Sequence, residues 1–332
     1  MPRTPPDTSN ESETAGGIAI GEALTRPALA ADTPAAWLAS HLVALFSHDD
    51  HDDDTDEPVW VEAGWRTVDD LVADDAAALR ALHGRLVADG TPPKTAATYL
   101  AGWTGGIIAE AVGFALATAG AGFVLDADRL AVHQHREGWL DGLDPGEPPA
   151  VLVVAGHPWA GQPGVEVVDT AETLVSRTVD ALVTACAPLV DACRSLAAVG
   201  RAGLWNEVGD GLGTAAVTWV DGLVATEAIF AVLHAAARAP AAPWKARPSL
   251  RFAHSETLGP VPVAQKGGCC LAYLKERPEP EPDDLDEDAR AYRERFPRAP
   301  GAPRYCSTCS LLDPGDCAAR QIFWRERRAA TT

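Results

Sequence analysis

One stretch decides the fold class: VDTAETLVSRTVDALVTACAPLVDACRSLAAV, which spans residues 168–199. Apolar side chains recur through it at steps of three and four residues, the spacing that places them on one face of an α-helix. The positions that set this period are Val175, Val179, Leu182, Val183, Cys186, Val190 and Cys193. The stretch therefore predicts a long helix with one buried face, kinked at Pro188. A free cysteine on such a face behaves as a small hydrophobic residue, so we expect Cys186 and Cys193 to pack in the core.

Further helices are predicted on both sides of this stretch, with a small β region between them. The expected helices cover residues 34–46, 68–88, 94–119, 201–220 and 225–240. The expected β-segments are Phe123–Leu125, Ala131–His135 and Val151–Val154, which alternate or are β-branched and are bounded by turn residues. Residues 244–254 are expected to be extended. The pattern predicts an α+β fold, mainly α-helical, in a single main domain with a C-terminal cysteine-rich segment.

Composition divides the chain into three parts. Residues 1–33 lack apolar periodicity and are predicted to be a disordered tail, residues 34–255 form the main domain, and residues 256–332 form the cysteine segment. A Pro-rich acidic insertion occupies about 276–303, and its residues 284–296 predict a short helix over the cysteines.

The run HDDHDDDTDEP at residues 48–58 contains metal-ligand residue types. Charges this dense repel one another and stay solvated, and the run lacks the spacing of a calcium loop, so a solvated loop is favoured there.

Charge and hydropathy exclude two classes of partner. The chain has 27 basic and 47 acidic residues and a formal net charge of −20, which repels nucleic-acid phosphates. Residues 104–124 are the most apolar long stretch, but Glu110 lies within it. A buried charge of this kind costs roughly 2.5–3.5 kcal/mol in a bilayer, so a buried helix is favoured over a membrane span. The N-terminus has no secretory-type apolar run, so a soluble, cytoplasmic protein is expected.

The cysteines near the C-terminus form the clearest chemical pattern. In a reducing compartment, clustered cysteines more often bind metal or do redox chemistry than form disulfides. Cys269 and Cys270 are adjacent, and Cys306 and Cys309 have C-x2-C spacing, which aims two sulfurs at one centre. Gly267 and Gly268 precede the adjacent pair, and they are expected to give its backbone freedom to turn both side chains toward one cluster.

The spacing leaves two metals open. Four thiolates without histidine match a [2Fe–2S] cluster, and they also match a structural zinc ion. Adjacent cysteines favour the larger two-iron cluster, because four ligands around one small ion need separated pairs. Cys317 is a fifth cysteine in this region, and we expect it to be a bystander.

Two motifs resemble a known family. The residues Cys269-Cys270-Leu271-Ala272-Tyr273 and Tyr305-Cys306-Ser307-Thr308-Cys309-Ser310-Leu311 resemble the C-terminal signature of FhuF-like ferric-siderophore reductases. Upstream, RAGLWNEVGDG at residues 201–211 is similar to that family's R-x-LW-x-N segment. The resemblance covers about residues 90–312. It departs from the family in the thirty-five residues that lie between Cys270 and Cys306, a longer separation than the family has.

The resemblance implies a cytoplasmic oxidoreductase. Cys269, Cys270, Cys306 and Cys309 would hold the [2Fe–2S] cluster, the substrate would be a ferric siderophore, and a separate donor would supply electrons. The sequence has no nucleophile elbow, phosphate loop or dinucleotide fingerprint that would indicate another chemistry.

Three residues of the upstream motif have two interpretations. Arg201, Trp205 and Asn206 are candidates for contacts with the substrate, or Trp205 and Asn206 are core residues that hold their helix. Two other functions stay open: an iron–sulfur electron carrier or sensor without its own substrate, and a zinc-stabilised helical scaffold.

Overall fold

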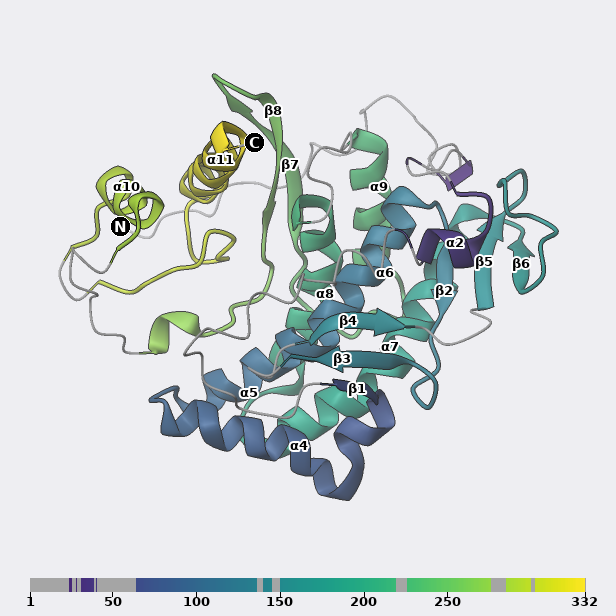
Figure 1. Cartoon of the computed structure of the whole chain (residues 1–332), viewed down its shortest axis with the longest axis horizontal. Coiled ribbons are helices and arrows are strands. Elements are labelled where there is room, and N and C mark those ends of the chain that lie inside the picture. The colour runs from purple at the N-terminus through teal and green to yellow at the C-terminus, as the bar shows by residue number, and fades with distance from the viewer. Residues whose placement is uncertain are drawn as a thin grey trace, which may run out of the picture.

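A computed structural model describes most of the chain, namely residues 24–25, 28, 31–38, 40, 64–135, 140–144, 150–218, 226–275, 285–299 and 302–331. The model is about 55% helical and 15% strand, with the strands in small sheets. Central helices lie between small sheets on one side and a hairpin with two C-terminal helices on the other (Figure 1). The prediction of a mainly helical α+β fold is confirmed.

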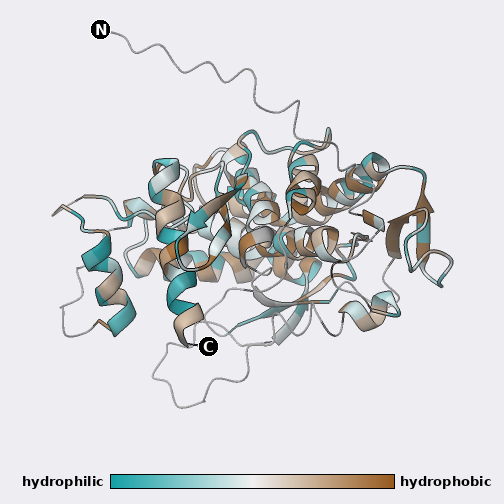
Figure 2. Ribbon diagram, turned by 90° about the horizontal axis from the view of Figure 1, so that it is seen from above, coloured by the Kyte–Doolittle hydropathy of each residue, from teal (hydrophilic) through white to brown (hydrophobic). Residues whose placement is uncertain are grey.

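Long helices form the centre of the protein. They are α4 (Val68–Ala88), α5 (Pro93–Ala101), the π-helical turn η2 (Gly102–Gly106), α6 (Ile107–Thr118), α7 (Ala171–Leu196), α8 (Arg201–Thr218) and α9 (Glu227–Ala237). The predicted ranges agree with these bounds within a few residues. Figure 2 shows apolar residues gathered on these central helices.

Helix α7 has the buried face that its sequence predicts. Thr170 caps its N-terminus by accepting a hydrogen bond from the backbone N–H of Thr173 at 3.1 Å. The helix runs on through Pro188. Cys186 and Cys193 are fully buried in the main core, so the prediction that they pack as hydrophobic residues is confirmed.

Glycines let α8 approach the α5–η2–α6 segment closely. A Cβ at Gly113 of α6 would lie 2.9 Å from the carbonyl oxygen of Leu212. A Cβ at Gly211 of α8 would overlap the carbonyl oxygen of Gly106. Only glycine fits at these crossings, because any side chain would push the two backbones apart.

Two helical segments are long and apolar enough to cross a membrane by length and composition. They are Pro93–Thr118 and Ala171–Leu196, and their most apolar windows are 83% and 50% buried inside the protein. Core helices of soluble proteins pass the same test, and the burial of the first segment agrees with its prediction as a buried helix.

The strands form three small sheets. The first has the order β1 (Gly64–Thr67), β3 (Ala131–Gln134), β4 (Leu140–Asp144) and is antiparallel. The second has the order β2 (Gly122–Val124), β5 (Ala150–Val154), β6 (Val165–Val168), with β2 antiparallel and β6 parallel to β5. The third is the antiparallel hairpin of β7 (Ser249–Ser255) and β8 (Gly259–Gln265). The sequence pattern did not predict β1, β4, β6 and β8.

The predicted N-terminal tail is too long. Leu24 is fully buried, and the carbonyl oxygen of Ala31 accepts a hydrogen bond from the indole N–H of Trp159 at 2.8 Å. These contacts place part of residues 24–33 against the core. Of the helix predicted at 34–46, the structure describes α2 (Pro34–Trp37) and the nearby residues Leu38 and Ser40. Residues 41–63, and with them the acidic run 48–58, lie outside the described residues.

The C-terminal segment is continuous with the main domain. The predicted boundary at residue 255 falls at the turn of the β7–β8 hairpin. On one face of the hairpin, Leu250 and Ala264 pack with Phe230 of α9; on the other, Val261 and Val263 pack with Ala318 of α11 (Pro314–Thr331). The boundary therefore divides one structural unit.

The short helix predicted in the acidic insertion exists as α10 (Glu287–Arg295). Its described contacts are with α11, which the sequence analysis did not predict. The ring of Tyr292 stacks on that of Trp324 with centroids 5.2 Å apart, and Arg327 pairs with Asp288. The prediction that this helix packs over the cysteines is therefore wrong, because its aromatic face is covered by α11.

Candidate functional site

Two loops bring the C-terminal cysteines together. The first follows β8 and carries Cys269 and Cys270, and the second precedes α11 and carries Cys306 and Cys309. The backbone N–H of Lys266 donates to the carbonyl oxygen of Thr308 at 2.8 Å, which joins the loops. The side-chain amide of Gln265 donates to the carbonyl oxygens of Cys309 and Leu312 at 3.2 and 2.9 Å. The end of β8 thus holds the second loop in place.

The four thiols interact across the two loops. The thiols of Cys270 and Cys306 interact across the loops, and this interaction raises the pKa of Cys270 and lowers the pKa of Cys306. Cys309 interacts with Cys306 and electrostatically with Cys269 and Cys270. Cys309 is buried, and the other three are partly exposed. All four predicted ligands therefore belong to one cluster of thiols at the edge of the protein.

Backbone N–H groups point at one sulfur in each pair. The N–H of Leu311 donates to the sulfur of Cys309 at 3.4 Å, and the N–H of Leu271 donates to the sulfur of Cys269. Burial raises the pKa of both thiols, and these hydrogen bonds oppose that rise. In each case the donor lies two residues after the cysteine. The two loops therefore stabilise thiolates in the same way.

The glycines before Cys269 serve close packing. A Cβ at Gly267 would overlap the backbone of Arg247, and a Cβ at Gly268 would lie 2.6 Å from the Cβ of Asn206. The left-handed backbone conformation in this loop falls on Leu271, which has a φ of 59°. The prediction that these glycines give the cysteine backbone freedom to turn is therefore wrong. Their lack of a side chain lets the loop pack closely against Arg247 and Asn206.

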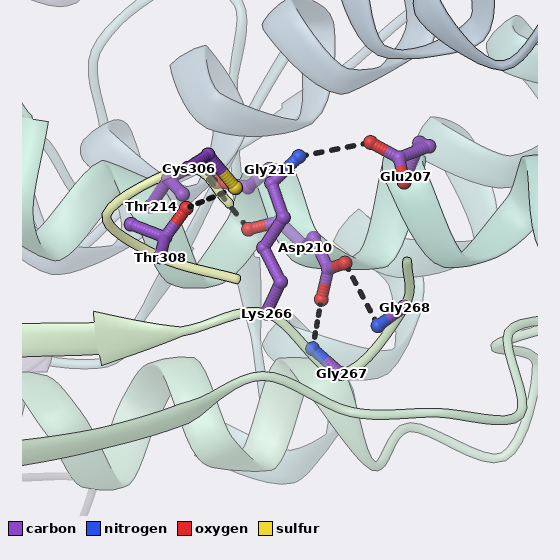
Figure 3. Close-up of polar contacts among 9 residues, drawn as sticks. All are labelled: Glu207, Asp210, Gly211, Thr214, Lys266, Gly267, Gly268, Cys306 and Thr308. Carbon is purple, nitrogen blue, oxygen red and sulfur yellow. Dashed lines mark hydrogen bonds and ion pairs between the residues drawn. The ribbon is translucent and has the colours of Figure 1, made fainter. Parts of the chain in front are cut away.

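Helix α8 supports the first loop with two buried acidic side chains, those of Glu207 and Asp210 (Figure 3). The carboxylate of Asp210 accepts hydrogen bonds from the N–H groups of Gly267 and Gly268 at 2.7 and 3.0 Å. The ammonium of Lys266 lies 2.9 Å from the carboxylate of Glu207. Glu207 and Asp210 are three residues apart and so lie on one helix face. No sequence pattern singled out Glu207, Asp210 or Lys266 as residues of the site.

Asp210 carries a strongly shifted carboxyl group. Burial raises the pKa of Asp210 to about 8, and the charge of Glu207 adds to the rise, while Lys266 and the two N–H donors oppose it. The folded protein then keeps a proton that the unfolded chain loses near pH 3.8. Since folding takes up this proton, the contribution of Asp210 to the free energy of unfolding falls as the pH rises from about 4 to about 8.

We therefore expect Asp210→Asn to gain stability relative to the wild type as the pH rises. The difference in the free energy of unfolding should move in favour of the variant between pH 5 and pH 8 and level off above pH 8. Urea unfolding at each pH measures it, with Asp180→Asn, at an exposed position on α7, as the matched control. A difference that stays constant over this range would contradict the assignment.

The three upstream candidates lie at different places on α8. Asn206 accepts hydrogen bonds from the backbone N–H groups of Lys245 and Ala246 at 2.9 and 3.1 Å, and so holds the chain that leads to β7. Trp205 is buried in the main core. Arg201 is exposed at the start of the helix and pairs with Asp191 at 3.0 Å. Asn206 thus anchors the chain before β7 and Trp205 packs in the core, which agrees with their interpretation as structural residues.

Cys317 lies on α11, under the second loop. Its thiol donates to the carbonyl oxygen of Ser307 at 3.1 Å and accepts a hydrogen bond from the side chain of Gln321 at 3.2 Å. It is fully buried, and burial raises the pKa of its thiol. Cys317 therefore supports the turn that carries Cys306 and Cys309.

No three His, Cys, Asp or Glu side chains among the described residues are grouped so that they could hold a single metal ion. This includes the cysteine cluster, in which Cys270 and Cys309 both interact with Cys306. A [2Fe–2S] cluster places two thiolates on each of two irons, so its four ligands do not converge on one point. The donor set and its N–H groups fit that cofactor.

Fold and site together define a mainly helical α+β protein with a cluster of four thiols between a β-hairpin, helix α8 and the loop before the C-terminal helix. No protein-family model, curated protein or solved structure matches the chain.

Proposed function

We propose that this protein is a ferric-siderophore reductase that carries a [2Fe–2S] cluster on Cys269, Cys270, Cys306 and Cys309. The observation that carries the proposal is the interaction between the two cysteine pairs, which are separated by thirty-five intervening residues in the sequence. The two motifs that resemble FhuF-like reductases, described above, include these cysteines and part of α8.

Two features support iron–sulfur over zinc. The ligand set is four cysteines without histidine, and two of them are adjacent, which suits a two-iron cluster better than a single small ion. Each pair also has a backbone N–H directed at a sulfur, and hydrogen bonds of this kind tune the potential of iron–sulfur centres.

The cluster, when bound, would supply one electron at a time to chelated Fe(III). A siderophore holds Fe(III) through hard anionic oxygens, and the gain of one electron lowers the charge of the metal and weakens its complex. The Fe(II) then leaves to other ligands, and a separate donor returns the electron. The protein's own residues hold the thiolates, donate N–H groups to them and keep Cys309 away from water. A reducing cytoplasm would suit this chemistry and the free cysteines.

The test has two stages. Purified protein should contain iron and inorganic sulfide and should absorb visible light with the brown colour of an iron–sulfur protein. Reduced protein mixed with ferrioxamine and an Fe(II) chelator should then yield chelated Fe(II). Zinc in place of iron would make the protein a zinc-stabilised scaffold, and a coloured protein that releases no Fe(II) would be a carrier or sensor; either result would refute the reductase proposal.

A further inference from the structure

Lys266 and Glu207 form an ion pair beside the cysteine loops. Lys266 directly follows β8 and lies three residues before Cys269. Its ammonium is 2.9 Å from Glu207, whose side chain is only 3% exposed. Two hydrogen bonds that the loop's N–H groups donate to Asp210 already fix the loop, and the backbone N–H of Lys266 already donates to the carbonyl oxygen of Thr308. The ion pair is therefore not needed to hold the first loop, and its charges can act on the cysteine centre.

Lys266 lies where the two cysteine loops meet: its backbone N–H donates to the carbonyl oxygen of Thr308, between Cys306 and Cys309, at 2.8 Å, and its ammonium pairs with Glu207 (Figure 3). From this position its positive charge favours the thiolate forms of Cys269, Cys270 and Cys306. Burial alone would lower the pKa of Lys266, but the negative charges of Glu207 and then Cys270 raise it above its usual value. The ion pair with Glu207 thus holds the side chain as a cation beside the cysteine loops, where charges are less screened than in bulk water.

Glu207 acts in the opposite sense. Its carboxylate raises the pKa of Cys269 and Cys270. One of its oxygens accepts the ammonium of Lys266, and the other is buried without a hydrogen-bond partner among the described residues. Glu207 therefore orients Lys266 and at the same time places a second, negative charge near the site (Figure 3).

We infer that Lys266, oriented by Glu207, is a positioning residue that raises the reduction potential of the cysteine centre. The inference rests on the proposed [2Fe–2S] function. Each electron adds one negative charge to a centre that its thiolates already make anionic. A fixed cation stabilises the reduced form more than the oxidised form, whereas a nearby carboxylate does the reverse.

The two charges predict potential shifts of opposite sign. Lys266→Met should lower the midpoint potential and Glu207→Gln should raise it, each by about tenfold in the reduction equilibrium, or about 59 mV for a one-electron couple. Glutamine can still accept a hydrogen bond from Lys266, so the ammonium stays near the sulfurs. Lys266→Arg keeps the charge and should lie closer to the wild type than Lys266→Met.

The matched control is Lys275→Met. Lys275 lies five residues after Cys270 but pairs with Asp89, which is 57% exposed, at 2.5 Å. The charges that act most strongly on Cys269, Cys270 and Cys306 include Lys266 and not Lys275, so removal of Lys275 should shift the potential much less than Lys266→Met does.

Redox titration of the full-length protein, followed by visible absorption and EPR, measures these shifts. Shifts of the same sign, or a Lys266→Met shift no larger than that of Lys275→Met, would overturn the inference while leaving the proposed function intact. Should Lys266→Met not load a cluster, Glu207→Gln decides alone: an upward shift supports the inference, and no shift or a downward one overturns it. Opposite shifts without release of Fe(II) from ferrioxamine would keep the inference and refute the reductase. Wild-type protein without iron and sulfide would refute both.

Discussion

Replacing Cys306 by serine is expected to abolish both the brown colour of the protein and its release of Fe(II) from ferrioxamine. Cys306 is one of the four proposed ligands of the cluster and interacts with Cys270 across the two loops. A serine hydroxyl has a far higher pKa and a harder oxygen, and soft thiolates are the ligands that iron–sulfur clusters select. Iron and sulfide content, visible absorption and the Fe(II) chelator assay measure the loss.

The matched control is Cys186→Ser, the same chemical change in the core. Cys186 is fully buried on α7, and burial raises the pKa of its thiol. Its sulfur lies 3.8 Å from the carbonyl oxygen of Gly105, too far for a hydrogen bond from a hydroxyl unless the side chain shifts. Colour and Fe(II) release should survive this change at a modest cost in stability. Equal losses in the two variants would show that Cys306 acts through folding alone.

Replacing Gly211 by alanine is expected to cause the largest loss of stability among changes outside the cysteines. The added methyl group would overlap the carbonyl oxygen of Gly106, where α8 crosses η2. Because a backbone carbonyl cannot move aside as the end of a side chain can, we expect the free energy of unfolding to fall by about 3 kcal/mol, at the upper end of the range for overpacking. Urea unfolding measures the loss. Iron content should fall as well, because Glu207 and Asp210 lie on the same helix.

Gly203→Ala is the control within the same helix. A Cβ at Gly203 meets no atom within 4 Å, so alanine there should be neutral or should stabilise the protein by about 0.5–1 kcal/mol through helix propensity. If the two variants unfold at similar urea concentrations, the close crossing of α8 and η2 is not the constraint that it is argued to be.

Much of the helical framework could be read from local patterns. The apolar period of α7 and the break at Pro92-Pro93 before α5 both lie within a few turns of chain, and both features appear where they were expected. The short strands were harder, because four residues such as β6 (Val165–Val168) become a strand only by pairing with β5. Helix α11 was missed because its polar sequence follows directly on the cysteines, and its apolar positions are explained only by the hairpin and α10 that cover them.

The sequence by itself determined the long helices and the grouping of four cysteines into two pairs, since helical period and ligand spacing are properties of neighbouring residues. Only the tertiary structure decided that Asp210 binds the N–H groups of the first loop and that Glu207 orients Lys266. These partners lie 57 to 59 residues apart in the chain. The physical reason is that a buried charge is tolerable only beside its partner, and that partner is chosen by how α8 and β8 pack, which no local pattern encodes.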